Sequence, residues 1–189
     1  MNLLILGIDD AGRGPVIGPM VLAGCLIREN AQKELKKLGV KDSKQLTPRR
    51  REFLERQIRK LAEKVAAVKI SPKTIDQSQE KGIKLNEVEA VACAKIINKL
   101  NDGKEKIKVF LDCPSSSLRK WSELLRTKIK NLANLEIYCE HKADKNHVSV
   151  SAASIIAKCI REREMKKLKE KYGEEMGSGY PSDPLTISF

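Results

Sequence analysis

A chain of 189 residues is long enough for one domain, and its 41% hydrophobic and 33% charged residues are typical of a globular protein. No apolar stretch approaches the ~20 residues of a membrane span and no signal-like leader is present, so we expect a cytoplasmic protein without a membrane partner. The net charge of +12 favours a polyanionic partner, whereas 4% aromatic residues argue against stacking of single-stranded bases. We therefore expect a single domain, residues 1–189, that binds a nucleic-acid backbone.

The first half of the chain predicts a strand hairpin, two helices and a third strand. Thr47 is a natural N-cap and Pro48 suits the first helical position, so a helix is expected to begin there. In chain order the expected elements are strands over 2–8 and 19–27, a helix over 31–38, a polar loop over 41–48, a helix from 48 to about 63 and a strand over 64–70.

The second half predicts alternating helices and strands. Its expected elements are helices opening at 71–72 and over 85–100, a strand over 107–113, a helix opening at 114–115, a strand over 135–144 that runs into a loop, and a helix over 150–172. The ordered pattern is expected to end at "GSGYPSDP". Three strands followed by strand–helix alternation predict an α/β sandwich, with a mixed five-stranded sheet flanked by helices.

The cysteines are scattered along the chain, and none forms a C-x-x-C pair: Cys25, Cys93, Cys113, Cys139 and Cys159. An odd, widely spaced set predicts reduced thiols in the core rather than disulfides or a zinc site. Cys113 is the one candidate for reactivity, because it follows Asp112.

Acidic residues follow three of the predicted strands: Asp9, Asp10, Asp112 and Asp144. The carboxyl ends of strands meet in a crevice in open α/β sheets, so Asp9 and Asp112 would face each other if their strands are neighbours. Carboxylates at short range do not stay ionised without cations, and Mg²⁺ and Mn²⁺ prefer oxygen ligands. The acids are either metal ligands or helix caps and loop acids, and four of them at strand ends favour a metal site.

The stretch "GIDDAGRGP", residues 7–15, places two of these acids in a glycine-rich turn. A Walker A phosphate loop is disfavoured because Arg13-Gly14 stands where Lys-Ser/Thr is required, and because the carboxylates would repel a phosphate. Dinucleotide binding is disfavoured because the glycine spacing differs and no helix follows. We expect the carboxylates to hold a cation while the glycine amides approach a phosphate or a sugar.

Further substrate contacts are predicted in two loops. Ser43 and Lys44 in "KDSKQL" are candidate phosphate contacts, with a solvated polar turn as an equal alternative. Lys142 and Lys145 flank Asp144, and they either hold the substrate backbone or balance the charge of the acid.

Other conspicuous residues are interpreted as structural. His141 and His147 are expected at the surface. Trp121 is expected in the core and Asn86 at the start of a helix. The small residues of "SAASIIAK", residues 151–158, are expected to let a helix pack closely on the sheet, and the charged run that follows them is expected to form a solvated helix face.

Seven stretches occur in a characteristic order between residues 6 and 184: "GIDDAGRGPVIGPMV", "GVKDSKQLTPRRRE", "LNEVEA", "FLDCP", "EHKAD", "VSAASIIAK" and "GSGYPSDP". Through them the chain resembles ribonuclease HII, the type 2 ribonuclease H family, and most closely its archaeal branch. An ordered set of this kind is far more specific than any single member.

The resemblance implies the ribonuclease H-like fold and hydrolysis, with Mg²⁺ or Mn²⁺, of RNA within RNA–DNA hybrids and at single ribonucleotides embedded in DNA duplexes. The expected products carry 3′-hydroxyl and 5′-phosphate ends. By position, the family's four metal-binding acids match Asp9, Asp10, Asp112 and Asp144. The segment that reads the ribose 2′-hydroxyl through its backbone matches Gly12, Arg13 and Gly14, and the tyrosine that packs on the sugar at the RNA-to-DNA junction matches Tyr180.

The sequence departs from the family pattern at three points. Asp10 stands where the family usually has Glu, Leu185 occupies a position that is often basic, and the chain stops at Phe189, where relatives continue through helices that help to grip the duplex. The alternative function is therefore that of a duplex-binding protein with weak or no catalysis. A monomer is expected, and no tail peptide is present from which a sliding-clamp contact could be predicted.

Overall fold

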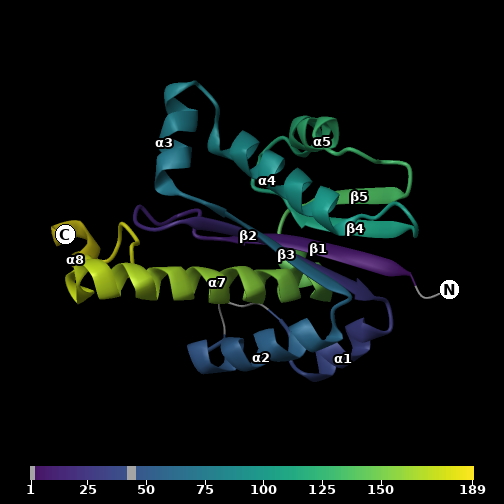
Figure 1. Cartoon of the computed structure of the whole chain (residues 1–189), viewed down its shortest axis with the longest axis horizontal. Coiled ribbons are helices and arrows are strands. Elements are labelled where there is room, and N and C mark those ends of the chain that lie inside the picture. Colours follow the sequence, from purple (N-terminus) through teal and green to yellow (C-terminus); the bar gives the residue numbers. More distant parts are fainter. Residues whose placement is uncertain (1–2, 42–45) are drawn as a thin grey trace.

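The structure is a computed structural model that describes residues 3–41 and 46–189. Five strands form one mixed sheet with helices on both faces (Figure 1). The strands are β1 (Leu4–Ala11), β2 (Met20–Arg28), β3 (Lys64–Ile70), β4 (Ile107–Asp112) and β5 (Leu135–Glu140). The helices are α1 (Ala31–Lys37), α2 (Pro48–Leu61), α3 (Pro72–Glu80), α4 (Leu85–Leu100), α5 (Leu118–Thr127), α6 (Ala143–Asn146), α7 (Val148–Tyr172) and α8 (Pro184–Ser188), with the 3₁₀ helix η2 (Glu174–Met176). The candidates Ser43 and Lys44 lie outside the described residues.

The sheet has the strand order β3-β2-β1-β4-β5. β1 pairs antiparallel with β2 and parallel with β4, and β4 pairs parallel with β5. The hairpin expected at the start of the sheet is confirmed, and the first and fourth strands are neighbours. Because β1, β4 and β5 run in the same direction, their carboxyl ends lie at one edge of the sheet.

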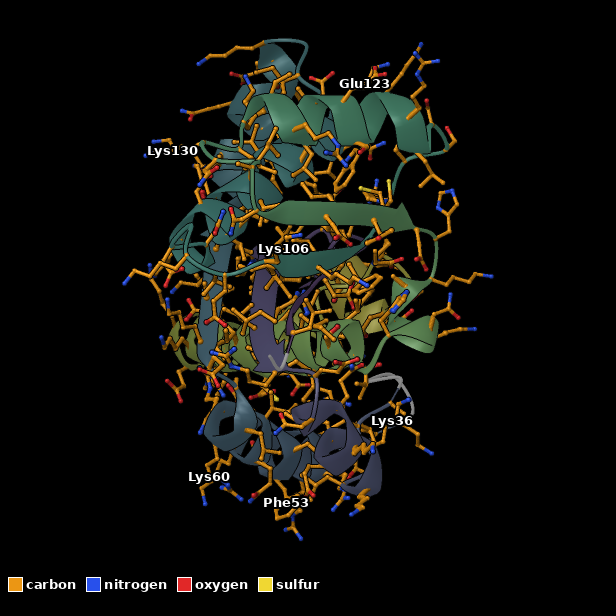
Figure 2. All side chains as sticks on the ribbon, turned by 90° about the vertical axis from the view of Figure 1, so that its right-hand side faces the viewer. Lys36, Phe53, Lys60, Lys106, Glu123 and Lys130 are labelled. Atoms are coloured by element: carbon orange, nitrogen blue, oxygen red, sulfur yellow. The ribbon has the colours of Figure 1, made fainter. Side chains whose placement is uncertain are left out.

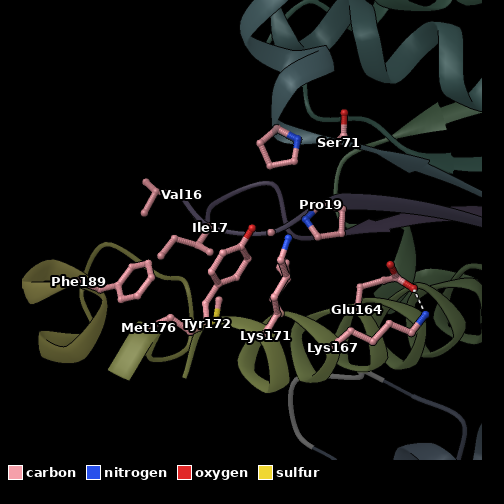
Figure 3. A pocket seen from close by; sticks show the side chains of 13 residues that line it. Val16, Ile17, Pro19, Ser71, Glu164, Lys167, Lys171, Tyr172, Met176 and Phe189 are labelled. Carbon is pink, nitrogen blue, oxygen red and sulfur yellow. Dashed lines mark hydrogen bonds and ion pairs between the residues drawn. The ribbon is translucent and has the colours of Figure 1, made fainter. Parts of the chain in front are cut away.

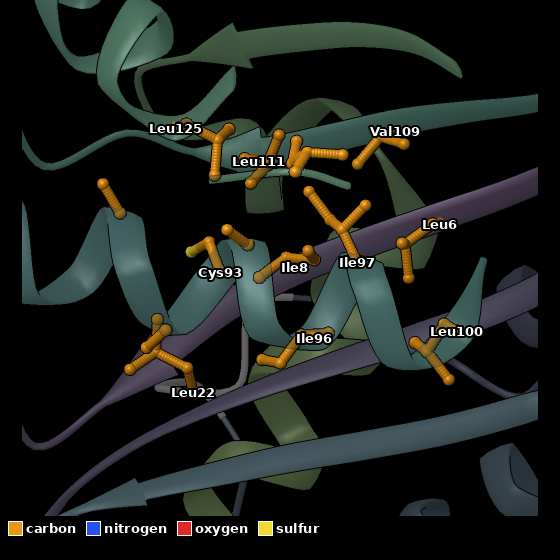
Figure 4. Close-up of a cluster of buried hydrophobic side chains, with 14 of the residues drawn as sticks. Leu6, Ile8, Leu22, Cys93, Ile96, Ile97, Leu100, Val109, Leu111 and Leu125 are labelled. Atoms are coloured by element: carbon orange, nitrogen blue, oxygen red, sulfur yellow. The ribbon is translucent and has the colours of Figure 1, made fainter. Parts of the chain in front are cut away.

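Two hydrophobic cores lie on opposite faces of the sheet, because successive side chains of a strand point to opposite faces. In β1, Leu6 and Ile8 pack in a cluster with α4 and α5 (Figure 4). Ile5, the residue before Leu6, points to the other face and packs in a second cluster with α1, α2 and α7. β1 is therefore enclosed between two helical layers, which makes its carboxyl end a rigid support for functional groups.

Helix α7 approaches β1 so closely that a side chain at Gly7 would not fit. A Cβ built on Gly7 would lie 2.1 Å from the backbone carbonyl carbon of Ser149. The first half of α7 is rich in small buried residues such as Ala152 and Ala153. The close packing expected for residues 151–158 is confirmed.

Gly7→Ala is expected to lower the free energy of unfolding by about 3 kcal/mol or more, because the added methyl group must displace backbone atoms rather than a flexible side chain. Chemical denaturation measures the difference from the wild type. Gly82→Ala is the matched control: a Cβ there meets no heavy atom within 4 Å, so its cost is limited to backbone strain at a φ of +73°. A Gly7→Ala protein as stable as the wild type would contradict this packing.

Several bounds follow the predictions, and others differ for local reasons. The Thr47 side chain caps α2 by accepting a hydrogen bond from the backbone N–H of Arg50. The bounds expected for β3 and α4 are confirmed. The helix expected to open at 114–115 begins only at Leu118, and the Ser115 hydroxyl accepts a hydrogen bond from the backbone N–H of Ser117 instead.

The strand expected over 135–144 is too long in the prediction. β5 ends at Glu140, and Lys142 then adopts a left-handed conformation with φ of +57°. This conformation ends the extended backbone and starts the short helix α6. Asp144 therefore lies in the first turn of a helix rather than in a loop.

The stretch "GSGYPSDP" does not end the ordered structure, as the sequence predicted. Asp183 Oδ1 accepts a hydrogen bond of 3.1 Å from the backbone N–H of Leu185 and caps α8. The Thr186 hydroxyl donates to the carbonyl of Met176 and accepts from the N–H of Gly179, at 3.0 and 2.9 Å. Over residues 3–41 and 46–189, no helix has the length and apolar character needed to cross a membrane.

All the cysteines are free thiols, as the spacing predicted, and only Cys139 is not fully buried. Burial raises the pKa of the Cys113 thiol to about 11. The thiol next to Asp112 is therefore protonated at neutral pH and is a poor nucleophile.

Candidate active site

The four acids predicted from the strand ends line one pocket of about 670 Å³. Asp9 and Asp10 lie near the end of β1, and Asp112 is the last residue of β4. Asp144 reaches the pocket from α6, directly after β5. Residues from three neighbouring parallel strands and the segments after them thus meet at one edge of the sheet, as the strand-end pattern predicted.

The acids repel one another in this pocket. Burial raises the pKa of Asp9 well above its usual value, and the charges of Asp10 and Asp112 raise it further. Burial also raises the pKa of Asp112, although the backbone N–H of Ala143 donates a hydrogen bond of 3.1 Å to its Oδ1. In both residues the hydrogen bonds from the protein do not offset the cost of burying an ionised carboxylate.

The donor set of the pocket fits a divalent cation, because such an ion would relieve this repulsion and prefers carboxylate oxygens. As the side chains stand, no three His, Cys, Asp or Glu residues in the part of the chain that the structure describes are grouped closely enough to hold a metal ion. The acids share the pocket without forming a closed cage, so a bound ion would draw their side chains together.

The loop of residues 12–14 also lines this pocket, and its two glycines have different structural roles. Gly12 has φ of +92°, and a Cβ there would lie 2.4 Å from Arg161 Nε. Gly14 does not have a positive φ, and a Cβ there would meet only Tyr180 Cε1, at 3.9 Å. The fold therefore requires glycine at position 12 but not at position 14.

Tyr180 lies beside the 12–14 loop, as expected for a residue of the same site. Its side chain is 41% exposed, and the guanidinium of Arg161 lies 5.6 Å from its ring centroid. Arg161 is buried and donates a hydrogen bond of 3.2 Å from Nη2 to the carbonyl of Ile17. The guanidinium of Arg161, held in place by Ile17, therefore supports one face of the exposed Tyr180 ring.

Helix α7 contributes a basic wall, which combines residues expected to pack on the sheet with residues of the charged run that was expected to face solvent. The α7 residues that line the pocket are Ser154, Lys158, Arg161, Glu162, Met165, Lys166 and Lys169. The hydroxyl of Ser154 is hydrogen-bonded to Asp9, where it opposes the rise of that pKa. The signal was present in the helical spacing of Ser154, Lys158 and Arg161, which places them on one face, but the position of that face depends on how α7 packs.

Glu89 of α4 is a fifth acid near the pocket that sequence reasoning missed. It is only 2% exposed, and burial together with the charge of Asp10 raises its pKa to about 8, against the opposing effect of Arg13. Glu89 stands inside a predicted helix, where an acid normally faces solvent, and the stretch "LNEVEA" that contains it gave no indication of a place beside the site.

The remaining candidates are distributed around the site. Lys142 donates a backbone hydrogen bond to Asp112, and its exposed side chain lies outside the pocket lining. His147 is half-buried rather than a surface residue: its ring stacks on Phe110 at 3.9 Å, and its Nε2 lies 3.0 Å from Glu140 Oε2. Trp121 is buried, as expected.

Positive charge is distributed widely over the surface. Figure 2 looks at the end of the molecule where Lys106 precedes β4, opposite the end that carries the acids, and basic side chains such as Lys60 and Lys130 extend from it. A second pocket, of about 600 Å³, lies beside α7 and is lined largely by apolar residues such as Tyr172 and Phe189 (Figure 3). It lacks the grouped carboxylates, so the acidic pocket is the candidate active site.

The fold has counterparts of known structure, and these define the class as a ribonuclease H-like α/β protein. The ribonuclease H2 of Pyrococcus horikoshii OT3 is 41% identical, with a TM-score of 0.87 over 98% of this chain and 84% of that one. The RNase HII in the PCNA:RNase HII complex of Archaeoglobus fulgidus is also 41% identical, with a TM-score of 0.85 over 98% of this chain and 86% of that one. Bst-RNase HIII, solved in complex with Mn²⁺, is 26% identical with a TM-score of 0.72 over 91% of this chain and 56% of that one.

Sequence relatives make the assignment specific. The family model for ribonuclease HII matches residues 6–189. The Methanococcus maripaludis C7 ribonuclease HII is 46% identical, over 98% of this chain and 76% of that protein, and the Methanothermobacter thermautotrophicus one is 44% identical, over 98% and 87%. The chain belongs to the ribonuclease HII family. It is a hydrolytic endoribonuclease that acts on RNA–DNA hybrids.

Proposed function

We propose that the chain also cuts at single ribonucleotides embedded in duplex DNA, leaving 3′-hydroxyl and 5′-phosphate ends, with Mg²⁺ or Mn²⁺ held by Asp9, Asp10, Asp112 and Asp144. One observation carries the proposal: the acids and the 12–14 loop line the same pocket. The carboxylates that would hold the catalytic ions and the 12–14 backbone that would contact the ribose therefore act on the same nucleotide. The relative solved with Mn²⁺ supports the use of a divalent ion.

The residues of the pocket have separable roles in this reaction. The carboxylates would hold a pair of divalent ions, which would supply an activated water and stabilise the leaving 3′ oxygen of an in-line displacement. The Ser154 hydroxyl orients Asp9, and the Ala143 N–H orients Asp112. A nucleophilic side chain is not needed, which agrees with the protonated state of Cys113.

The choice of RNA over DNA requires a contact with the 2′-hydroxyl, and an accessible backbone can provide it. Gly14 is exposed and carries no side chain, so a sugar can approach its peptide groups. The Tyr180 ring beside it offers a flat surface for the next sugar. Lys158, Lys166 and Lys169 of α7 are placed to hold phosphates at the rim of the pocket.

Cleavage of a labelled DNA duplex that contains one ribonucleotide tests the proposal. We expect a single cut with Mg²⁺ or Mn²⁺, none with excess chelator, and none in the matched all-DNA duplex. The alternative is a duplex-binding protein with weak or no catalysis, and binding of the same duplex without a cut would favour it. We further propose a monomer, because one chain supplies the acids and the loop.

Tyr180→Ala is expected to slow cleavage at a single ribonucleotide about tenfold or more, the scale on which loss of an aromatic stacking surface is felt. The free energy of unfolding should fall by about 1 kcal/mol at most, because the ring is 41% exposed and its contact with the Arg161 guanidinium is of the kind that contributes little at an exposed site. Tyr172→Ala is the control, since Tyr172 is similarly exposed and lines the other pocket. A loss of stability as large as the loss of activity would make Tyr180 a structural residue.

A further inference from the structure

The side chain of Arg13 is bound to helix α4. Its Nη2 donates a hydrogen bond to Asn86 Oδ1, and its Nη1 lies 3.5 Å from Glu89 Oε2. Asn86 and Glu89 are three residues apart, so they lie on one face of α4. One rigid element therefore presents both an amide oxygen and a carboxylate to a single guanidinium.

Both anchors on α4 are themselves held in place. Glu89 is 2% exposed, and no hydrogen-bond donor in the described part of the chain reaches either of its carboxyl oxygens. The Arg13 guanidinium at 3.5 Å opposes the rise in its pKa that burial causes. Asn86 lies in the first turn of α4, where its backbone carbonyl accepts a hydrogen bond of 2.9 Å from Nε1 of the buried Trp121. The start of α4 cannot shift without breaking this contact.

The other side of the 12–14 loop is limited by α7. Gly12 lies so close to Arg161 that a Cβ would be 2.4 Å from Nε, and its φ of +92° allows no other residue without strain. The loop is thus held between α4 and α7. The position of the exposed Gly14 backbone follows from these two contacts.

We propose that Asn86 and Glu89 are positioning residues for ribonucleotide selection, and that the Arg13 side chain is an anchor for the 12–14 loop rather than a contact to a substrate phosphate. The inference rests on the proposed function, in which this loop reads the ribose. In this proposal α4 holds Arg13 and so keeps the peptide groups of the neighbouring Gly14 within reach of the ribose 2′-hydroxyl.

The test compares the dissociation constants for a DNA duplex with one ribonucleotide and for the identical all-DNA duplex, with chelator so that no strand is cut. We expect Asn86→Ala to lower the preference for the ribonucleotide about tenfold, the scale of one lost hydrogen bond to a charged group. Binding of the all-DNA duplex should be unchanged. Asn86→Asp retains the acceptor oxygen and should restore the preference.

Two further variants separate anchoring from other effects. Asn98→Ala removes hydrogen bonds to the backbone of Lys128 and Lys130 from the same helix, and it should leave the preference intact. Arg13→Ala should lower the preference as Asn86→Ala does, and the double variant should be no worse than either single one. The slope of log affinity against log salt should be the same for Arg13→Ala and the wild type.

The outcomes distinguish the inference from the proposed function. If the wild type binds both duplexes equally, ribose reading by this loop is wrong. If the wild type prefers the ribonucleotide and Asn86→Ala keeps that preference, the positioning role is wrong. If Arg13→Ala lowers the salt slope by about 0.9, Arg13 contacts a phosphate and is not an anchor.

Discussion

Asp112→Asn is expected to slow the cleavage of an RNA–DNA hybrid about a thousand-fold or more, the scale on which losing one electrostatic stabiliser of a transition state is felt. The change removes one charge from the acidic pocket and keeps the side-chain volume. Its amide oxygen can still accept the hydrogen bond from the N–H of Ala143. Steady-state cleavage of one labelled hybrid in Mg²⁺ measures the loss.

The pKa of Asp112 also determines in which direction this substitution changes the stability of the fold. The pKa of Asp112 is raised in the folded state, so its ionised form opposes folding above that pKa, and the penalty disappears as pH falls below the ordinary pKa of an aspartate. At neutral pH, Asp112→Asn should therefore be at least as stable as the metal-free wild type. Added Mn²⁺ should raise the melting temperature of the wild type more than that of the variant. Asp102→Asn, on an exposed turn, is the control, and full activity in Asp112→Asn would refute the metal site.

Gly14→Ala is expected to slow cleavage at a single ribonucleotide about a hundred-fold, because a methyl group would displace the sugar by an ångström or more from the backbone that reads it. The fold should not suffer: Gly14 does not have a positive φ, and a Cβ there meets only Tyr180 Cε1, at 3.9 Å. Denaturation should therefore show a change of stability within about 1 kcal/mol, in either direction.

A matched glycine tests whether this loss is specific. Gly82→Ala adds a methyl group in open space on the α3–α4 connection and should leave the cleavage rate unchanged. If Gly14→Ala cleaves at the wild-type rate, the sugar does not approach this backbone. The proposed role of the 12–14 loop would then be wrong, while the metal site would be unaffected.

Much of the secondary structure could be predicted because its determinants are local. Thr47 and Pro48 mark the start of α2, and the apolar spacing over residues 85–100 gives the bounds of α4. The incorrect bound predicted for β5 also has a local cause. A left-handed Lys142 after a short strand has no signature in the sequence, because a lysine rarely adopts that conformation without support from the surrounding fold.

The sequence by itself determined the composition of the site: acids directly after apolar strands, and a glycine-rich turn beside two of them. The tertiary structure alone decided which residues share the pocket. Pairing of β1 with β4 brings Asp9 near Asp112, and packing of α7 on β1 turns Lys158 and Arg161 toward the acids. Arg13 and Asn86 are 73 residues apart, and their contact depends on how α4 lies across the sheet. Periodicity shows which face of an element is buried, but it does not show which distant residue that face meets. For this reason the contacts of Asn86 and Glu89 with Arg13 became visible only in the folded chain.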